Sequence, residues 1–139
     1  MGAPGSSRPQ RLIVGISGAS GAVYGVRLLE LLRDTPIETH LVVSKSALIT
    51  LAHETEMSWS RLKTLADVSY VNQDIGAAIA SGSFKTMGMI IAPCSIRSLS
   101  EIASGVTSTL LTRAADVVLK ERRRLVLMVT QVWVTLVLL

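Results

Sequence analysis

The sequence predicts a single α/β domain in which helices cover both faces of a parallel β-sheet. Two observations lead to this fold class. Short apolar runs rich in β-branched residues alternate with longer segments whose apolar residues recur at helical spacing, which is typical of βαβ units. The apolar content is 49% of the chain and is mostly valine, isoleucine, leucine and alanine, with only 4% aromatic residues. Strands that are buried on both faces have this composition.

The predicted elements follow one another with short connections. Strands are expected at residues 12–16, 39–43, 87–92 and 125–129, and helices at residues 22–33, 45–54, 58–66, 98–104 and 109–120. Glycine and serine are frequent between residues 68 and 84, where we expect an irregular stretch with helical fragments. The domain should span residues 11–128, after a disordered tail at 1–10 and before an atypical apolar tail at 129–139.

Charge and apolar patterning exclude two classes of partner. The net charge is +4, and the basic run at 120–124 has no interleaved aromatic residues, so we expect a solvated helix end and no nucleic-acid partner. Residues 125–139 are nearly all apolar, but they fall short of the roughly 20 residues of a membrane span. They also contain Thr130, Gln131 and Thr135. We therefore expect a buried strand with an apolar extension and no membrane partner.

The cysteine and histidine content argues against disulfides and metal sites. Cys94 is the only cysteine, which makes an internal disulfide impossible and favours a reducing, cytoplasmic location. His40 and His53 have no partners at metal-ligand spacing, so no metal site is expected.

Candidate binding or catalytic residues follow three of the predicted strands. In open parallel sheets, ligands bind beyond the carboxyl ends of the strands. The first group is G-I-S-G-A-S-G at 15–21, where glycines permit close backbone approach, the next helix offers free N–H groups, and Ser17 and Ser20 add hydroxyl donors. This pattern favours a phosphate site; a plain strand–helix turn is the alternative. It lacks the spacing of a dinucleotide fingerprint.

Three further groups each have a structural alternative. Cys94, in A-P-C-S-I-R-S-L-S, has no histidine nearby in sequence, so we expect a packing role and not a nucleophile. Glu54 ends the second predicted helix and by residue type alone is a solvated carboxylate. Arg113 and Lys120 share a helix face and could hold a phosphate, although Asp116 and Lys120 could instead form an i,i+4 ion pair.

Taken together, these segments resemble the flavin prenyltransferase (UbiX) family over residues 11–128. The similar segments, in the family's order, are R-L-I-V-G-I-S-G-A-S-G-A-V-Y-G, E-T-H-L-V-V-S-K, S-G-S-F, P-C-S-I-R-S-L and R-A-A-D-V-V-L-K-E-R-R. The resemblance implies a Rossmann-like (flavodoxin-like), homo-oligomeric protein that binds FMN. It also implies transfer of a dimethylallyl group from dimethylallyl phosphate to N5 and C6 of reduced FMN, for use by a partner decarboxylase in ubiquinone or aromatic acid metabolism.

The resemblance also implies roles for individual residues. Those that would line FMN are Gly18, Ala19, Ser20, Ser44, Ser95, Ile96, Arg97 and Ser98. Arg113 and Lys120 would bind the prenyl phosphate, partly from a neighbouring subunit, and Ser20, Glu54 and Lys120 would act in catalysis.

After the last predicted strand the sequence departs from the family. The family continues with P-R-E or R-E-T-P, whereas Val129, Thr130 and Gln131 stand here, so we expect an altered, early-ending tail and impaired prenyl transfer. Two alternatives stay open: a non-catalytic FMN-binding or interaction protein, and a related flavin-dependent cysteine decarboxylase. The second is disfavoured because P-C-S-I-R-S stands where those enzymes carry a P-A-S-A-N-T-like stretch.

Overall fold

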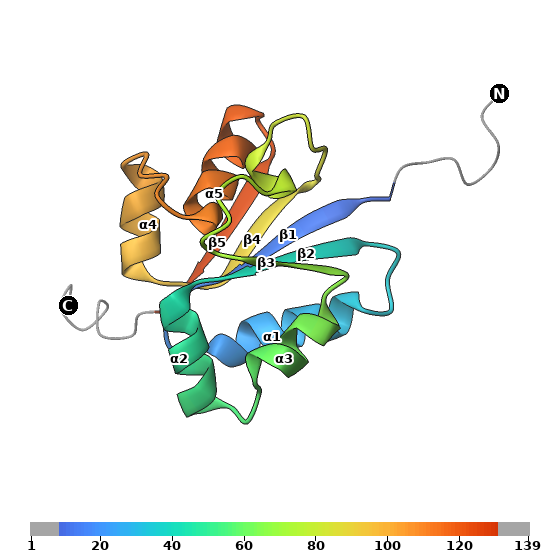
Figure 1. Ribbon diagram of the computed structural model, residues 1–139, viewed down its shortest axis with the longest axis vertical. Helices are drawn as coiled ribbons and strands as arrows, with labels where there is room; N and C mark the ends of the chain where they lie inside the picture. Colours follow the sequence, from blue (N-terminus) through green and yellow to red (C-terminus); the bar gives the residue numbers. More distant parts are fainter. Residues whose placement is uncertain (1–8, 131–139) are drawn as a thin grey trace.

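A computed structural model describes residues 9–130 of the chain. Five parallel strands form one sheet in the order β3-β2-β1-β4-β5, and helices cover both of its faces (Figure 1). The elements are β1 (Arg11–Ile16), α1 (Ala22–Leu32), β2 (Glu38–Val43), α2 (Lys45–Glu54), α3 (Trp59–Leu62), η1 (Lys63–Leu65), β3 (Val68–Val71), η2 (Ala78–Ala80), β4 (Gly88–Cys94), α4 (Ile96–Ala103), α5 (Leu110–Lys120) and β5 (Arg124–Val129). The expected Rossmann-like α/β fold is confirmed.

The sheet separates two hydrophobic cores. Alternate residues of a strand point to opposite faces, so Leu12, Val14 and Ile16 pack with α1, α2 and α3, while Ile13 packs with α5 on the other face. Figure 1 shows α1, α2 and α3 on one side of the sheet and α4 and α5 on the other. Strands sandwiched in this way are apolar at nearly every position, as the sequence indicated.

The segment from residue 68 to residue 84 contains a strand that the sequence did not predict. Val68–Val71 forms β3, an edge strand that pairs with β2. Val68 and Val71 are exposed, so the strand lacks the buried pattern that identifies the central strands. The remainder of the segment is irregular apart from the 3₁₀ helix η2, as expected. Residues 1–8 and 131–139, with most of the two predicted tails, lie outside the described residues.

Strand order reverses at the centre of the sheet. The chain passes from β1 to β2 and β3 on one side and then returns to β4 and β5 on the other side of β1. The carboxyl ends of β1 and β4 therefore diverge into helices on opposite faces, and a crevice opens between those helices. This geometry determines where a ligand can bind.

One close contact between α1 and the sheet gives a stability prediction. A β-carbon at Gly25 would lie within 3.0 Å of the carbonyl oxygen of Ala92 and about 2.6 Å from Cδ1 of Ile16. We expect Gly25→Ala to lower the free energy of unfolding by about 1–3 kcal/mol, in spite of the better helix propensity of alanine. Urea denaturation measures this. Gly76→Ala is the control, since nothing lies within 4 Å there, and equal stability losses in both variants would contradict the packing.

Candidate functional site

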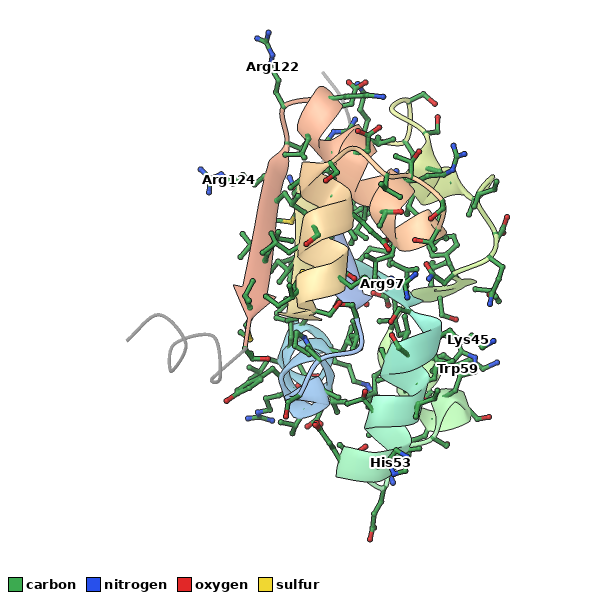
Figure 2. All side chains as sticks on the ribbon, turned by 90° about the vertical axis from the view of Figure 1, so that its left-hand side faces the viewer. Lys45, His53, Trp59, Arg97, Arg122 and Arg124 are labelled. Carbon is green, nitrogen blue, oxygen red and sulfur yellow. The ribbon has the colours of Figure 1, made fainter. Side chains whose placement is uncertain are left out.

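A cleft of about 380 Å³ lies at the carboxyl edge of the sheet, where three helices begin. Its size is within the range of small-molecule sites, roughly 300–1,000 Å³. The N-termini of α2, α4 and α5 surround it, and the residues that line it are Ser44, Lys45, Ser46, Ile49, Asn72, Ser95, Arg97, Ser98, Glu101, Ser108, Thr109, Leu111 and Thr112. Figure 2 shows Arg97 and Lys45 at the adjoining ends of α4 and α2. The cleft thus combines hydroxyl groups, cations and helix N-termini.

Ser17 connects the glycine-rich segment 15–21 to the start of α4. The Ser17 side chain is buried; its Oγ donates to the carbonyl oxygen of Pro93 at 3.2 Å and accepts from the amide of Ser95 at 2.7 Å. The Ser17 amide also donates to Pro93, at 3.1 Å. The prediction that Ser17 offers its hydroxyl to a phosphate is therefore wrong, because both hydrogen-bonding functions are used within the protein.

The N-terminus of α1 is closed by Glu54, from the last turn of α2. Its Oε2 accepts from the amides of Gly21 at 3.0 Å and Ala22 at 3.2 Å, and its Oε1 accepts from the Ser20 hydroxyl at 3.0 Å. The backbone hydrogen bond from Gly21 is the main reason that the pKa of Glu54 lies below its usual 4.5, with further lowering by Ser20 and Ala22. The amides of Gly21 and Ala22 thus donate to a carboxylate of the protein, and the expected phosphate site at this loop stays a prediction.

The three helices around the cleft differ in how many first-turn amides remain available. In α2, Ser44 caps only the amide of Ala47, and in α4, Ser95 caps only that of Ser98. The first two amides of each helix have no acceptor in the described part of the chain. In α5, by contrast, the amides of the first three residues all have acceptors. Asn72 accepts hydrogen bonds from two of them and Thr109 from the third. Open donors therefore come from α2 and α4.

The structure brings several residues predicted to line FMN together at the cleft. Ser44, Ser95, Arg97 and Ser98 line it, and Ile96 lies in the same first turn of α4. Arg97 also donates to Glu101 at 2.9 Å, while its side chain stays 90% exposed and can turn toward a ligand.

The other predicted FMN residues lie in the loop after β1. A β-carbon at Gly18 would be about 2.6 Å from Cβ of Ser46, so only glycine permits this approach to the cleft wall. Ala19 is buried, and Ser20 donates to Glu54.

Arg113 and Lys120 are not brought to the cleft within one chain. Nε of Arg113 is buried and has no hydrogen-bond partner among residues 9–130. Lys120 lies at the far end of α5, where Nζ pairs with Asp116 at 2.8 Å as the i,i+4 alternative anticipated. Their role at a prenyl phosphate stays a prediction.

Sequence reasoning missed Asn72, Ser108, Thr109 and Thr112 as cleft residues. Asn72 follows β3, which was not predicted, so the rule that ligands lie beyond strand ends could not be applied to it. Thr109 is the first residue of the helix predicted at 109–120 and caps the observed helix α5. The T-x-x-T spacing of the capping box that it forms with Thr112 is the signal that could have located this wall.

Among the described residues, no group of three or more His, Cys, Asp or Glu side chains could hold a metal ion. Within the same range, no helix is both long and apolar enough to cross a membrane.

Comparison with known proteins identifies the family of the chain. The flavoprotein family model matches residues 2–136. The flavin prenyltransferase UbiX of Escherichia coli is 63% identical over 123 residues, which cover 88% of this chain and 65% of that protein. The chain belongs to the UbiX family of flavoproteins. It spans about two thirds of the length of such relatives: 65% for the enzyme of Escherichia coli and 62% for that of Thauera aromatica, which is 57% identical.

Solved structures of UbiX-type proteins have the same fold. The crystal structure of AnUbiX in complex with FMN and dimethylallyl pyrophosphate superposes with a TM-score of 0.88 at 45% identity, covering 90% of this chain and 66% of that one. A dodecameric FMN-dependent UbiX-like decarboxylase from Escherichia coli gives a TM-score of 0.87 at 50% identity, covering 88% of this chain and 68% of that one. The UbiX-type resemblance seen in the sequence is confirmed.

The Glu54 contacts predict a pH-dependent effect on stability. We expect Glu54→Gln to lower the free energy of unfolding at neutral pH by no more than about 1 kcal/mol, because the carboxylate is exposed. Folding lowers the Glu54 pKa, so its contribution is complete above the usual value of 4.5 and disappears as the pH falls through the lower folded-state pKa. Urea denaturation at neutral and acidic pH measures the difference. Glu56→Gln is the control, and an effect of Glu54→Gln that grows toward acidic pH would contradict the assignment.

Cys94, the last residue of β4, packs in the core as predicted. It is fully buried, and burial raises the pKa of its thiol above the usual 9.0. We expect the native protein to react with a thiol reagent such as Ellman's reagent only as fast as it unfolds, and the same protein in guanidinium chloride to react at once. Rapid reaction of the native protein at neutral pH would show that the thiol is accessible and would contradict the packing role.

Proposed function

We propose that the chain binds FMN in the cleft between α2, α4 and α5. The observation that carries this proposal is the pair of open helix N-termini, α2 and α4, which face a cleft lined by Ser44, Ser46, Ser95 and Ser98. A flavin mononucleotide presents a phosphate and a ring edge rich in acceptor atoms, and backbone amides, hydroxyls, Lys45 and Arg97 are suitable donors to both. The residues present therefore fit the cofactor that the family name and the solved relatives indicate.

We further propose that the chain belongs to a flavin prenyltransferase, with dimethylallyl phosphate as the second substrate. Reduced FMN supplies the nucleophilic N5 and C6 positions that receive the dimethylallyl group. The departing phosphate needs cationic partners, and Arg113, whose buried Nε lacks a partner among the described residues, and Lys120 are suited to this. The 63% identity with a flavin prenyltransferase supports this choice of substrate.

The pair Ser20–Glu54 is proposed to move protons at this site. The hydrogen bonds from Gly21, Ser20 and Ala22 keep the Glu54 pKa below its usual value, so Glu54 is ionised at neutral pH and accepts a proton as a weaker base than a free glutamate. The Ser20 hydroxyl, 3.0 Å away, lies on the loop that reaches the cleft and can relay a proton to it.

Self-association and a partner decarboxylase complete the proposal. Exposed apolar side chains on α1 and β5, among them Val23, Tyr24, Leu31, Val126 and Met128, are suited to contacts between subunits. One relative of known structure is dodecameric. The buried thiol of Cys94 agrees with a cytoplasmic location, where a decarboxylase could collect the prenylated flavin.

The binding test uses one substitution in the cleft and one matched control. We expect Ser46→Leu, which places a bulky group in the cleft, to weaken FMN binding at least about tenfold. Ser60→Leu, on the exposed side of α3, should leave binding unchanged. Quenching of FMN fluorescence on titration gives the dissociation constants. Full affinity in folded Ser46→Leu would place the flavin elsewhere.

The activity test separates the enzyme from a non-catalytic flavin carrier. The FMN-loaded chain is reduced without oxygen and incubated with dimethylallyl phosphate, and the extracted flavin is analysed by mass spectrometry. Prenylated FMN is the expected product, formed slowly because the sequence from Val129 departs from the family pattern. If FMN binds and no prenylated FMN forms, the chain is a binding protein and the proposed transfer activity is wrong.

A further inference from the structure

Asn72 stands at the junction of the cleft and β3. It directly follows the last residue of β3 and is half-buried, and it lines both the cleft and a smaller hollow of about 80 Å³ between α2, α3 and β3. No expected role in FMN or phosphate binding falls on this residue.

Two hydrogen bonds join Asn72 to the start of α5. Its main-chain oxygen accepts from the amide of Leu110 at 2.9 Å, and its Oδ1 accepts from the amide of Leu111, also at 2.9 Å. Thr109 accepts from the third amide, that of Thr112, at 3.3 Å. The three first-turn amides of α5 are thereby satisfied by groups of the protein itself, and two of them donate to Asn72, which lies 38 positions before the first residue of the helix.

These contacts fix one wall of the cleft. Leu110 and Leu111 are buried in the core against β4, so the helix cannot rotate without losing packing. Thr109, Leu111 and Thr112 then project along the cleft from a fixed helix start. Because the α5 amides are occupied, the amides of α2 and α4 are left as the open first-turn donors among the helices that surround the cleft.

We propose that Asn72 is a positioning residue for the flavin site, which rests on the proposed FMN binding. Its side chain holds the first turn of α5 against the end of β3 and so sets the width of the cleft. It also keeps the α5 N-terminus from competing with α2 and α4 for the acceptor atoms of the ligand. Asn72 acts on the ligand through α5 and not by reacting with it.

The experiment compares Asn72→Ala, Asn72→Asp and Gln73→Ala in the full chain. Alanine removes the Oδ1 acceptor, whereas aspartate retains an acceptor oxygen at a helix N-terminus, where a negative charge is favourable. Gln73 is exposed and its side chain makes no hydrogen bond within residues 9–130, which makes it the matched control. Two quantities are measured: amide hydrogen exchange of residues 110–112 without FMN, and the dissociation constant for FMN.

We expect Asn72→Ala to lose protection at residues 110–112 and to bind FMN about three- to tenfold more weakly, in keeping with the loss of one helix cap. Asn72→Asp should restore both quantities, and Gln73→Ala should change neither. Unchanged exchange in Asn72→Ala would show that the side chain does not hold α5, and weaker exchange protection with unchanged FMN affinity would reduce Asn72 to a purely structural role; either result overturns the proposal. Failure of the unsubstituted chain to bind FMN would instead refute the proposed function, and the positioning role with it.

Discussion

The hydrogen bonds of Ser17 hold together the point where the strand order reverses, and the site depends on them. The buried hydroxyl connects the end of β1 to Pro93 and to the amide of Ser95, the residue that caps α4. The amide of Ser44, which caps α2, donates to Ile16 at the same end of β1, at 2.9 Å. Both helices with open N-termini are therefore anchored to one strand end. Leaving these buried polar groups unpaired would cost about 1–3 kcal/mol each.

The four long helices that begin at this edge of the sheet divide into two kinds. Glu54 occupies the start of α1, and Asn72 occupies the start of α5, so the protein neutralises these two positive ends with its own acceptors. The first turns of α2 and α4 keep donors for a ligand. An acceptor-rich anion that enters the cleft therefore finds open first-turn amides only on these two of the helices that surround it.

The sequence was sufficient to predict four of the five strands and insufficient for the edge strand β3. Strands buried on both faces are apolar at nearly every position, so β1, β2 and β4 could be predicted, and with them the cleft residues Ser44 and Ser95. The first and last valines of β3 are exposed, so this strand lacks the apolar pattern. Asn72 directly follows β3 and was therefore not predicted as a cleft residue. A hydroxyl in a glycine-rich loop indicates hydrogen bonding but not its partner; the partner of Ser17 is 76 residues away and appears only in the fold.

The most direct test of this account is a crystal structure of the chain with FMN, read for the backbone amides that lie within hydrogen-bonding distance of the cofactor. We expect FMN in the cleft, with its acceptor atoms on first-turn amides of α2 and α4, and with Glu54 and Asn72 still hydrogen-bonded to α1 and α5. FMN held by the first turns of α1 or α5, with Glu54 or Asn72 displaced, would contradict it.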